Sequence, residues 1–267
     1  MPLPKDEPLA LNAVGCVVVR GLVKDRDGKK PKDFRLELRV RKKLSSGRCG
    51  RVFPTSTTSL SDPSNSSDAI LSPAPPVLPE LVIKIARPNY VESLGREAAA
   101  YHEMQAIQGV SIARCYGWFE AELGKDHVLF DGGESDDSDN DSGPNAPAPR
   151  TNKVSFLVLE RLGRNLKMFV NYEEDADIYE VYEDLGFTGV DHADVRYANI
   201  LMRPKSSRAL PTLKCPFHNV VHHYRVVDFD RATKTDFTME GYNSRTELDL
   251  GMLFEGIVRG RIIEPWF

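Results

Sequence analysis

The sequence predicts an α+β protein with two lobes, the first rich in β-strands and the second mainly helical. Strand-like segments dominate as far as residue 159 and helical segments dominate after it. Of the 267 residues, 41% are hydrophobic, which is ordinary for a globular protein and allows one large core or two small ones. We divide the chain into an N-terminal extension (1–33), a β-rich lobe (34–159) and a shortened, mainly helical lobe (160–267).

The ordered part of the first lobe is predicted from five segments. Residues 34–41 alternate apolar and charged side chains, a period of two that is typical of a strand with one wet face. Residues 81–86 (LVIKIA) form a short β-branched run with one lysine, and residues 113–120 and 154–160 are also strand-like. Apolar residues at helical spacing predict a helix over residues 91–108, with a glycine directly after it as a stop signal.

Two segments of the first lobe are too polar to join a core. Residues 54–80 are dominated by Ser, Pro and Thr, and residues 131–150 are acidic and rich in Pro and Gly. We expect both to be disordered insertions on the surface, because the closure entropy of a loop grows only slowly with its length. Ser135, Ser138 and Ser142 could be phosphorylated, although a solubilising insertion is the favoured interpretation.

The second lobe is predicted to be mainly helical. Residues 164–187 have mostly helical propensity, and residues 244–258 predict another helix. Residues 199–202 and 224–228 are short and apolar, as expected of two strands.

Composition narrows the classes of partner and compartment. A formal net charge of -4 gives no global reason to expect nucleic acid or an anionic membrane, and no apolar run reaches the length of a membrane span. The N-terminus lacks the pattern of a secretory signal, so we expect an intracellular protein, cytoplasmic or nuclear, with free thiols. The basic segment 24–43 favours a solvated strand face over nucleic-acid contact.

Two elements of the first lobe could contact phosphate. The segment Ser45-Ser-Gly-Arg-Cys-Gly-Arg-Val52 follows the alternating strand, and its glycines Gly47 and Gly50 would let the backbone approach phosphate oxygens closely. An ordinary hairpin turn is the alternative. Lys84 lies on an otherwise apolar strand, so its ammonium group must reach either solvent or an anionic partner.

The most specific motif lies in the second lobe. The segment HADVRYANIL gives His192, Asp194 and Asn199 in the spacing H-x-D-x-x-x-x-N, running into an apolar strand. Further along the chain the segment VVDFD places Asp228 at the end of another apolar strand. Carboxylate and amide oxygens are ligands that Mg²⁺ prefers.

Together these residues resemble the protein-kinase-like superfamily, and HADVRYANIL followed by VVDFDRA is most similar to divergent kinase-like proteins of fungi. The resemblance spans about residues 34–256 and implies a bilobal kinase-like fold with a reduced C-lobe that binds ATP and Mg²⁺.

The resemblance also implies roles for individual residues. Asp194 would accept or orient the substrate hydroxyl proton, Arg196 would neutralise charge on the transferred group, and Asn199 and Asp228 would hold the metal. Lys84, held by a helix glutamate, would contact the phosphates, and two residues after Leu159 would bind the adenine edge through their backbone. The nucleotide-binding set is Gly47, Gly50, Val52, Lys84, Glu97, Glu160 and Leu162.

The sequence departs from the kinase pattern at several points. Ser45 replaces the first glycine of the loop, and Ala193 replaces the arginine that often holds a phosphorylated activation segment. Asp230 stands in place of glycine, as in small-molecule kinases of the aminoglycoside and choline type. No Ala-Pro-Glu motif follows, and few residues remain before Phe267 for a full helical lobe, so we expect an unusual mode of substrate binding or a truncated product.

The leading hypothesis is an ATP- and magnesium-dependent phosphotransferase acting on a hydroxyl, with an unidentified protein as substrate. Retention of Lys84, Asp194, Asn199 and Asp228 favours activity. The alternatives are a pseudokinase that binds nucleotide as a scaffold, a small-molecule kinase and, last, a nucleic-acid binder that uses the basic segment.

A second candidate metal site consists of Cys215, His218, His222 and His223. Cysteine and histidine at such spacing could bind zinc. The sequence disfavours this interpretation, because the histidines run into the strand expected at residues 224–228.

Overall fold

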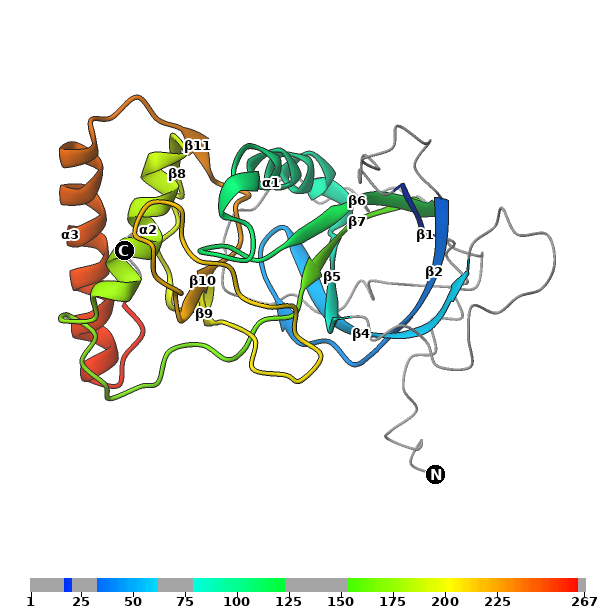
Figure 1. Ribbon diagram of the computed structural model, residues 1–267, viewed down its shortest axis with the longest axis horizontal. Coiled ribbons are helices and arrows are strands. Elements are labelled where there is room, and N and C mark those ends of the chain that lie inside the picture. Colours follow the sequence, from blue (N-terminus) through cyan, green and yellow to red (C-terminus); the bar gives the residue numbers. More distant parts are fainter. Residues whose placement is uncertain (1–16, 21–32, 62–78, 123–152, 264–267) are drawn as a thin grey trace. The chain divides into compact units, whose positions relative to one another are not determined.

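The computed structural model describes residues 17–20, 33–61, 79–122 and 153–263. The chain forms two compact units, one comprising Met1–Leu94 and Tyr116–Leu159 and the other Gly95–Cys115 and Glu160–Phe267. A largely antiparallel sheet makes up most of the first unit, whereas two of the three α-helices that the described residues form lie wholly in the second (Figure 1). The predicted α+β class is therefore confirmed. The acidic segment 131–150, with its serines, lies outside the described residues.

The sheet of the first unit has 7 strands in the order β1-β2-β4-β5-β7-β6, with β3 paired to β4. The pairs β1–β2, β2–β4, β3–β4 and β4–β5 are antiparallel. The strands are β1 (Val17–Arg20), β2 (Asp33–Val40), β3 (Ser45–Ser46), β4 (Gly50–Ser61), β5 (Leu81–Ala86), β6 (Cys115–Glu122) and β7 (Lys153–Glu160).

The central strand β5 is buried along its whole length. Leu81, Ile83 and Ile85 pack with Phe156 and Val158 of β7 in one hydrophobic cluster. A continuous apolar run suits a strand that is covered on both faces, which is why LVIKIA could be recognised from sequence. The strand consequently gives a rigid support to the lysine in its middle.

Strand β4 continues into a segment that the sequence predicted to be a loop. Its residues pair with β2 as far as Ser61, and the hydroxyl of Thr55 donates to the carbonyl of Leu81 at 3.1 Å. The prediction for residues 54–61 was therefore wrong, because Thr55, Ser56 and Thr57 fit a half-buried strand although they lack apolar character. Residues 62–78 lie outside the described residues.

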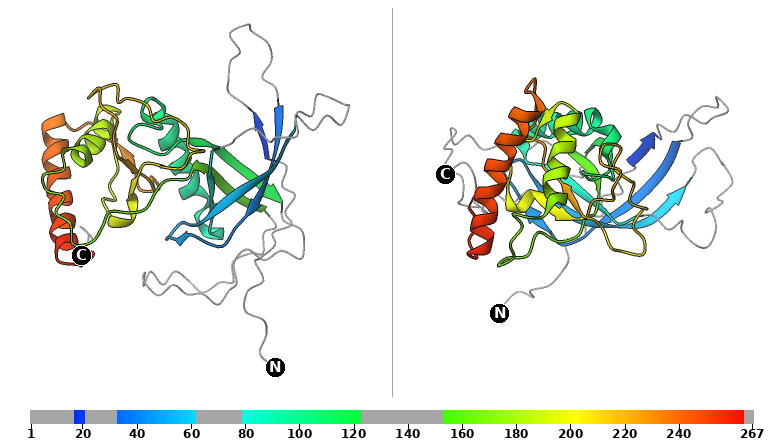
Figure 2. Two further views of the ribbon diagram at one scale, coloured as in Figure 1. Left: turned by 60° about the horizontal axis from the view of Figure 1, so that its bottom comes forward. Right: turned by 60° about the vertical axis from the view of Figure 1, so that its left-hand side comes forward.

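The helices are α1 (Val91–Glu103), which begins in the first unit and continues into the second, α2 (Ala176–Phe187) and α3 (Met239–Val258). Helices α2 and α3 lie side by side (Figures 1 and 2), and the hydroxyl of Tyr242 donates to the carbonyl of Tyr182 at 3.1 Å. The hydroxyl of Thr238 caps α3 by accepting from the backbone N–H of Gly241 at 3.2 Å. Among the described residues, no helix is long and apolar enough to cross a membrane.

The helix predicted over residues 164–187 forms only in its second half. Residues 164–175 are irregular, and Phe169 has a φ of 63°, which a right-handed helix cannot accommodate. The buried Tyr172 anchors this segment, since its hydroxyl accepts from the backbone N–H of Lys167 at 2.8 Å. Tertiary packing thus overrides local helical propensity here.

Three other boundaries also differ from expectation. The first helix ends at Glu103, with a short 3-10 helix at Gln105–Ile107 after it. Helix α3 starts at Met239 because Thr238 supplies a cap. The strand predicted over 224–228 ends at Val226, where pairing with the preceding strand stops.

Two short antiparallel ladders complete the second unit. They consist of β8 (Val190–Asp191) with β11 (Thr233–Lys234), and β9 (Ile200–Met202) with β10 (Tyr224–Val226). The base of the β9–β10 hairpin is closed by the backbone N–H of Arg203, which donates to the carbonyl of His223 at 2.7 Å. Residues 203–223, all of them described, leave and re-enter this hairpin without forming a helix or strand.

Candidate active site

The H-x-D-x-x-x-x-N segment forms the connection from β8 to β9 and is tied to the residues that follow β10. The Nε2 atom of His192 lies 2.9 Å from the carbonyl oxygen of Val227. The backbone N–H of Val227 in turn donates to the carbonyl of Asn199 at 3.1 Å. These two contacts hold the two motifs of the second lobe next to each other.

Packing of Phe229 holds the motif around Asp228 in place. Its side chain is fully buried, and its ring lies edge-on to Tyr101 and to His192 with both centroid distances at 5.0 Å. Edge-to-face pairs of this kind stabilise one orientation of the rings. The aspartates on either side of Phe229 are thereby held in defined positions.

The backbone is unusual at two points of this site. Ala193 has a φ of 53° and Asp228 has a φ of 70°, in the left-handed region that residues with a Cβ seldom adopt. Such conformations persist only where the surrounding structure imposes them, and they cluster at functional sites. The contacts of His192 and Val227 supply that constraint.

Three carboxylates converge in the second unit. Asp194, Asp228 and Asp230 each place a carboxylate oxygen within 4.8 Å of the others. The side-chain amide of Asn199 donates to the carbonyl of Asp194 at 3.0 Å and to its Oδ2 at 3.2 Å. Arg196 Nε lies 2.6 Å from Asp194 Oδ1, so the arginine is paired with the predicted base. We call Asp194, Asp228 and Asp230 the acidic cluster.

Burial and charge act on Asp194 in opposite directions. Burial raises the pKa of its carboxyl, the nearby Asp228 raises it further, and Arg196 and His192 lower it, leaving the pKa above its usual value. A raised pKa brings a carboxylate closer to the range useful for accepting a proton. The oxygen-only donor set and the mutual repulsion of the three acids fit a hard divalent cation such as Mg²⁺.

The predicted phosphate-contacting residues lie together in the first unit. Strands β3 and β4 form a hairpin in which the backbone N–H of Gly47 donates to the carbonyl of Gly50 at 2.9 Å. Val52 is directly opposite Lys84 in the β4–β5 register, and Lys84 is only 6% exposed. A Cβ at Gly50 would lie 2.6 Å from the carbonyl oxygen of Ile85, so the close strand pairing requires glycine there.

Arg87 supports the same hairpin, a role that the sequence gave no reason to assign. Its Nε donates to the carbonyl of Gly47 at 3.1 Å, and its Nη2 donates to the hydroxyl of Ser46 at 3.1 Å. The turn is thus held by a side chain from beyond the end of β5. These hydrogen bonds join residues about forty positions apart, so no local sequence pattern indicates the role of Arg87.

The remaining predicted nucleotide-binding residues belong to the second unit. Glu97 is fully buried in α1, and Leu162 is half-buried. The carboxylate of Glu160 is paired with Arg114 Nη1 at 2.6 Å, and its backbone N–H donates to the carbonyl of Arg114 at 2.8 Å. Lys84 and Glu97 lie in different units, so their pairing remains a prediction.

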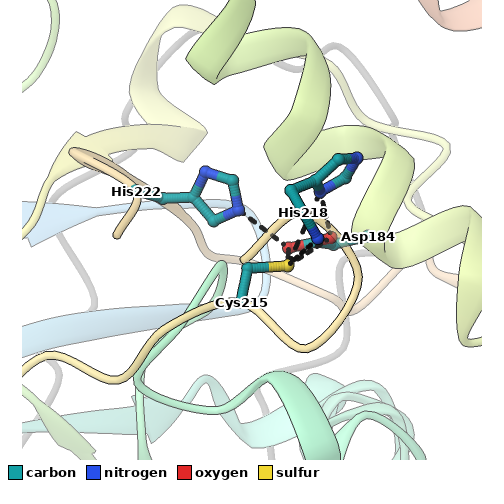
Figure 3. A group of neighbouring side chains, drawn as sticks. All are labelled: Asp184, Cys215, His218 and His222. Atoms are coloured by element: carbon teal, nitrogen blue, oxygen red, sulfur yellow. Dashed lines mark hydrogen bonds and ion pairs between the residues drawn. The ribbon is translucent and has the colours of Figure 1, made fainter. Parts of the chain in front are cut away.

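A second cluster, which sequence reasoning disfavoured, also forms in the second unit. Asp184 of α2 lies beside Cys215, His218 and His222 (Figure 3), with ligand atoms all within 4.8 Å of one another. Strand β10 begins at Tyr224, as the sequence predicted, and this strand does not keep the three side chains before it apart. The Cys-x-x-His-x-x-x-His spacing was the available signal, whereas Asp184 could be added only from the fold.

Comparison with known proteins finds similarity to solved structures and none by family model or curated sequence. Among solved structures, the chain is similar to the crystal structure of a Plasmodium kinase domain, at 18% sequence identity and a TM-score of 0.41. The alignment covers 75% of this chain and 52% of that one, so the chain spans about half the length of the kinase domain that it matches.

Proposed function

We propose that the protein is an ATP-dependent phosphotransferase of the kinase-like fold that transfers the γ-phosphoryl group to a hydroxyl, with a protein serine or threonine as the first candidate acceptor. The observation that carries the proposal is the convergence of the Asp194 and Asp228 carboxylates beside Asn199. These groups come from two remote motifs whose spacing resembles that of kinases, and backbone hydrogen bonds join the two segments.

The residues of the second unit would have different roles in phosphoryl transfer. Asp194, with its raised pKa, would accept or orient the proton of the acceptor hydroxyl. Asn199 and Asp228 would hold Mg²⁺, which neutralises phosphate charge when bound. Arg196, which pairs with Asp194 at 2.6 Å, would neutralise charge on the transferred group.

The residues of the first unit and the two residues Glu160 and Leu162 after Leu159 would bind the nucleotide. The glycine hairpin would bring backbone N–H groups to the phosphates, and the buried Lys84 would supply a positive charge held by Glu97. The backbone after Leu159 would contact the adenine edge. The full set proposed for the nucleotide is Gly47, Gly50, Val52, Lys84, Glu97, Glu160 and Leu162.

Thermal unfolding with nucleotide tests the binding part of the proposal. MgATP should raise the melting temperature of the full chain, because a ligand that binds only the folded state stabilises it. The shift should be smaller with ATP and a chelator, and smaller again for Asp228→Asn with MgATP. The absence of any shift in the wild type would overturn every nucleotide-based function.

Transfer of label from ATP tests the chemistry. Wild type should label itself or a protein mixture, and Asp194→Asn should lose about 100- to 10,000-fold in rate, which is the contribution of a positioned acid or base. Asp236→Asn is the matched control, since Asp236 is exposed and lies outside the acidic cluster. A melting shift without transfer would mean a nucleotide-binding scaffold and would overturn the enzymatic proposal.

A second candidate, a small-molecule kinase, is favoured by Asp230. This residue occupies the position at which the kinase pattern has glycine, is 6% exposed and belongs to the acidic cluster. The same labelling reaction with a metabolite mixture distinguishes the two candidates. Label found only in low-mass products would exclude the protein-kinase version.

A further inference from the structure

Four side chains of mixed chemistry meet outside the residues proposed for phosphotransfer (Figure 3). Cys215 Sγ lies 3.0 Å from Asp184 Oδ1 and 3.5 Å from His218 Nδ1. His218 Nδ1 lies 3.0 Å from Asp184 Oδ1, and His222 Nε2 lies 3.2 Å from Asp184 Oδ2. Asp184, Cys215 and His222 are buried and His218 is half-buried. We call these four residues the Cys-His cluster.

The backbone turn after Cys215 is shaped to support a thiolate. The backbone N–H groups of Phe217 and His218 donate to the sulfur at 3.3 Å and 3.4 Å. The backbone N–H of Asn219 donates to the carbonyl of Cys215 at 2.9 Å, with Asn219 in the left-handed region at a φ of 60°. Two amide hydrogens directed at one sulfur stabilise negative charge there.

Each histidine of the cluster is oriented by a carboxylate on its outer nitrogen. His218 Nε2 lies 3.0 Å from Glu183 Oε2, and His222 Nδ1 lies 2.7 Å from Asp177 Oδ1. The opposite nitrogens, Nδ1 of His218 and Nε2 of His222, therefore face the centre. A carboxylate on the outer nitrogen of a histidine is the usual arrangement around protein-bound metal.

His222 adds a separate indication. Its side chain is fully buried, yet Nε2 makes no hydrogen bond of acceptable geometry among the described residues, although an oxygen of Asp184 lies 3.2 Å away. A buried nitrogen in this situation normally has a partner. A metal ion at the centre of the cluster would provide one.

We propose that Asp184, Cys215, His218 and His222 bind a structural zinc ion. One sulfur, two imidazole nitrogens and one carboxylate oxygen complete a tetrahedral shell with no open position, as in structural rather than catalytic zinc sites. Ligand atoms around tetrahedral zinc are separated by about 3.3 to 3.6 Å. The four separations given above, 3.0 to 3.5 Å, are within a few tenths of an ångström of that range, and the ligand atoms of all four residues lie within 4.8 Å of one another.

The donor set also selects the metal. Mg²⁺ and Ca²⁺ prefer oxygen donors throughout, which suits the acidic cluster, whereas a thiolate with two imidazoles suits Zn²⁺. On binding, the thiol of Cys215 gives its proton to solvent and the two facing histidine nitrogens act as neutral donors. No electron transfer is involved.

The position of the cluster shows what a metal would stabilise. Residues 203–223 form a long connection without helix or strand, and loops of that kind are uncommon in compact domains unless something orders them. This connection joins β9, which follows Asn199, to β10, which precedes Asp228. Zinc bound by α2 and by the connection would anchor both strands that adjoin the proposed metal-binding residues Asn199 and Asp228.

Metal content of the full chain, freed of any histidine tag, tests the proposal. Wild type purified from zinc-containing medium should carry about one zinc per chain, and Cys215→Ser and His222→Ala should lose it. Cys115→Ser and His223→Ala are matched controls that should keep it, since Cys115 lies outside the cluster and the His223 side chain is 61% exposed. Asp194→Asn should also keep it, which separates this proposal from the phosphotransfer site.

Two measurements on the wild type keep the proposal testable if the cluster variants fail to fold. A strong chelator should lower the melting temperature and added Zn²⁺ should restore it. Replacement by Co²⁺ should give the visible absorption of a tetrahedral site with a thiolate ligand. Wild type that contains no stoichiometric zinc and does not respond to chelator would overturn the proposal and leave the cluster as a metal-free network of buried ion pairs.

Discussion

The acidic cluster and the Cys-His cluster lie in the same unit and are both largely buried, but they balance their charges differently. Burial raises the pKa of Asp194, and its partners do not reverse this effect. Burial also raises the pKa of Asp184, but its interactions with His222, Ser111 and Cys215 prevail and leave the pKa below its usual value. The same cost of burial therefore has opposite outcomes.

The two carboxyl groups differ in pKa because the groups around them differ. Burial lowers the pKa of His222, but its interactions with Asp177, Asp184 and Cys215 outweigh that effect and raise it to about 10. A positive charge at the imidazole can thus replace a metal in the Cys-His cluster. In the acidic cluster, Arg196 lowers the pKa of Asp194 but does not return it to its usual value, and perturbed pKa values of this kind are common at functional sites.

The largest effect is expected from Asp184→Ala. Removing this fully buried carboxylate takes a partner from Ser111, Cys215 and His222 at once, so the free energy of unfolding should fall by about 3 to 5 kcal/mol. Urea denaturation followed by circular dichroism measures the change. The exposed Asp236→Ala should change stability by less than about 0.5 kcal/mol, and equal effects of the two variants would contradict the comparison.

Ser111→Ala should give the next largest effect. The Ser111 hydroxyl is buried and donates to Asp184 Oδ2, so its loss removes a hydrogen bond to a charged group. The expected cost is about 1.5 to 3 kcal/mol in the same urea experiment. A change near zero would mean that the partners of Asp184 are not what holds its charge.

Asp194→Asn should act in the opposite direction on stability while abolishing phosphoryl transfer. Because the fold raises the pKa of Asp194, the ionised carboxylate works against folding at neutral pH, and the neutral amide should raise the free energy of unfolding by about 0.5 to 2 kcal/mol. The advantage should shrink as the pH falls through the raised pKa, where wild type becomes protonated. Loss of stability at neutral pH would place Asp194 with the fully partnered acids.

Arg196→Ala should have the smallest effect on stability. Its ion pair with Asp194 is one-third exposed on the arginine side, so the change should be at most about 1 kcal/mol. Arg196 lowers the pKa of Asp194, so its removal should raise that pKa and move the acid limb of the pH–rate profile to higher pH. An unmoved limb would show that Asp194 is not the group that titrates.

The sequence predicted those parts of the molecule in which one local signal dominates. Strand β5 was located from its continuous apolar run, and the motifs around Asp194 and Asp228, which the structure brings together, were located from their spacing and their resemblance to kinase motifs. Asp184 could not be found in this way, because it looks like any polar residue on α2 and acquires its neighbours only when residues 203–223 fold against that helix.

Local propensity gave the wrong secondary structure where tertiary contacts determine it. The polar half of β4 was interpreted as loop because strand pairing with β2 is not visible in composition. Residues 164–175 were assigned to a helix although Tyr172 anchors them in an irregular path. In both segments the deciding contact comes from outside the window that a propensity argument can examine.

The closed base of the β9–β10 hairpin determines where the chain can tolerate an insertion. Met202 pairs with Tyr224, and Arg203 is bonded to His223, so the ends of the connection stay together whatever lies between them. Insertions near the exposed Lys205 and Arg208 would add length without displacing either strand. That outer stretch is thus a natural position for an attached fluorophore or a short peptide tag.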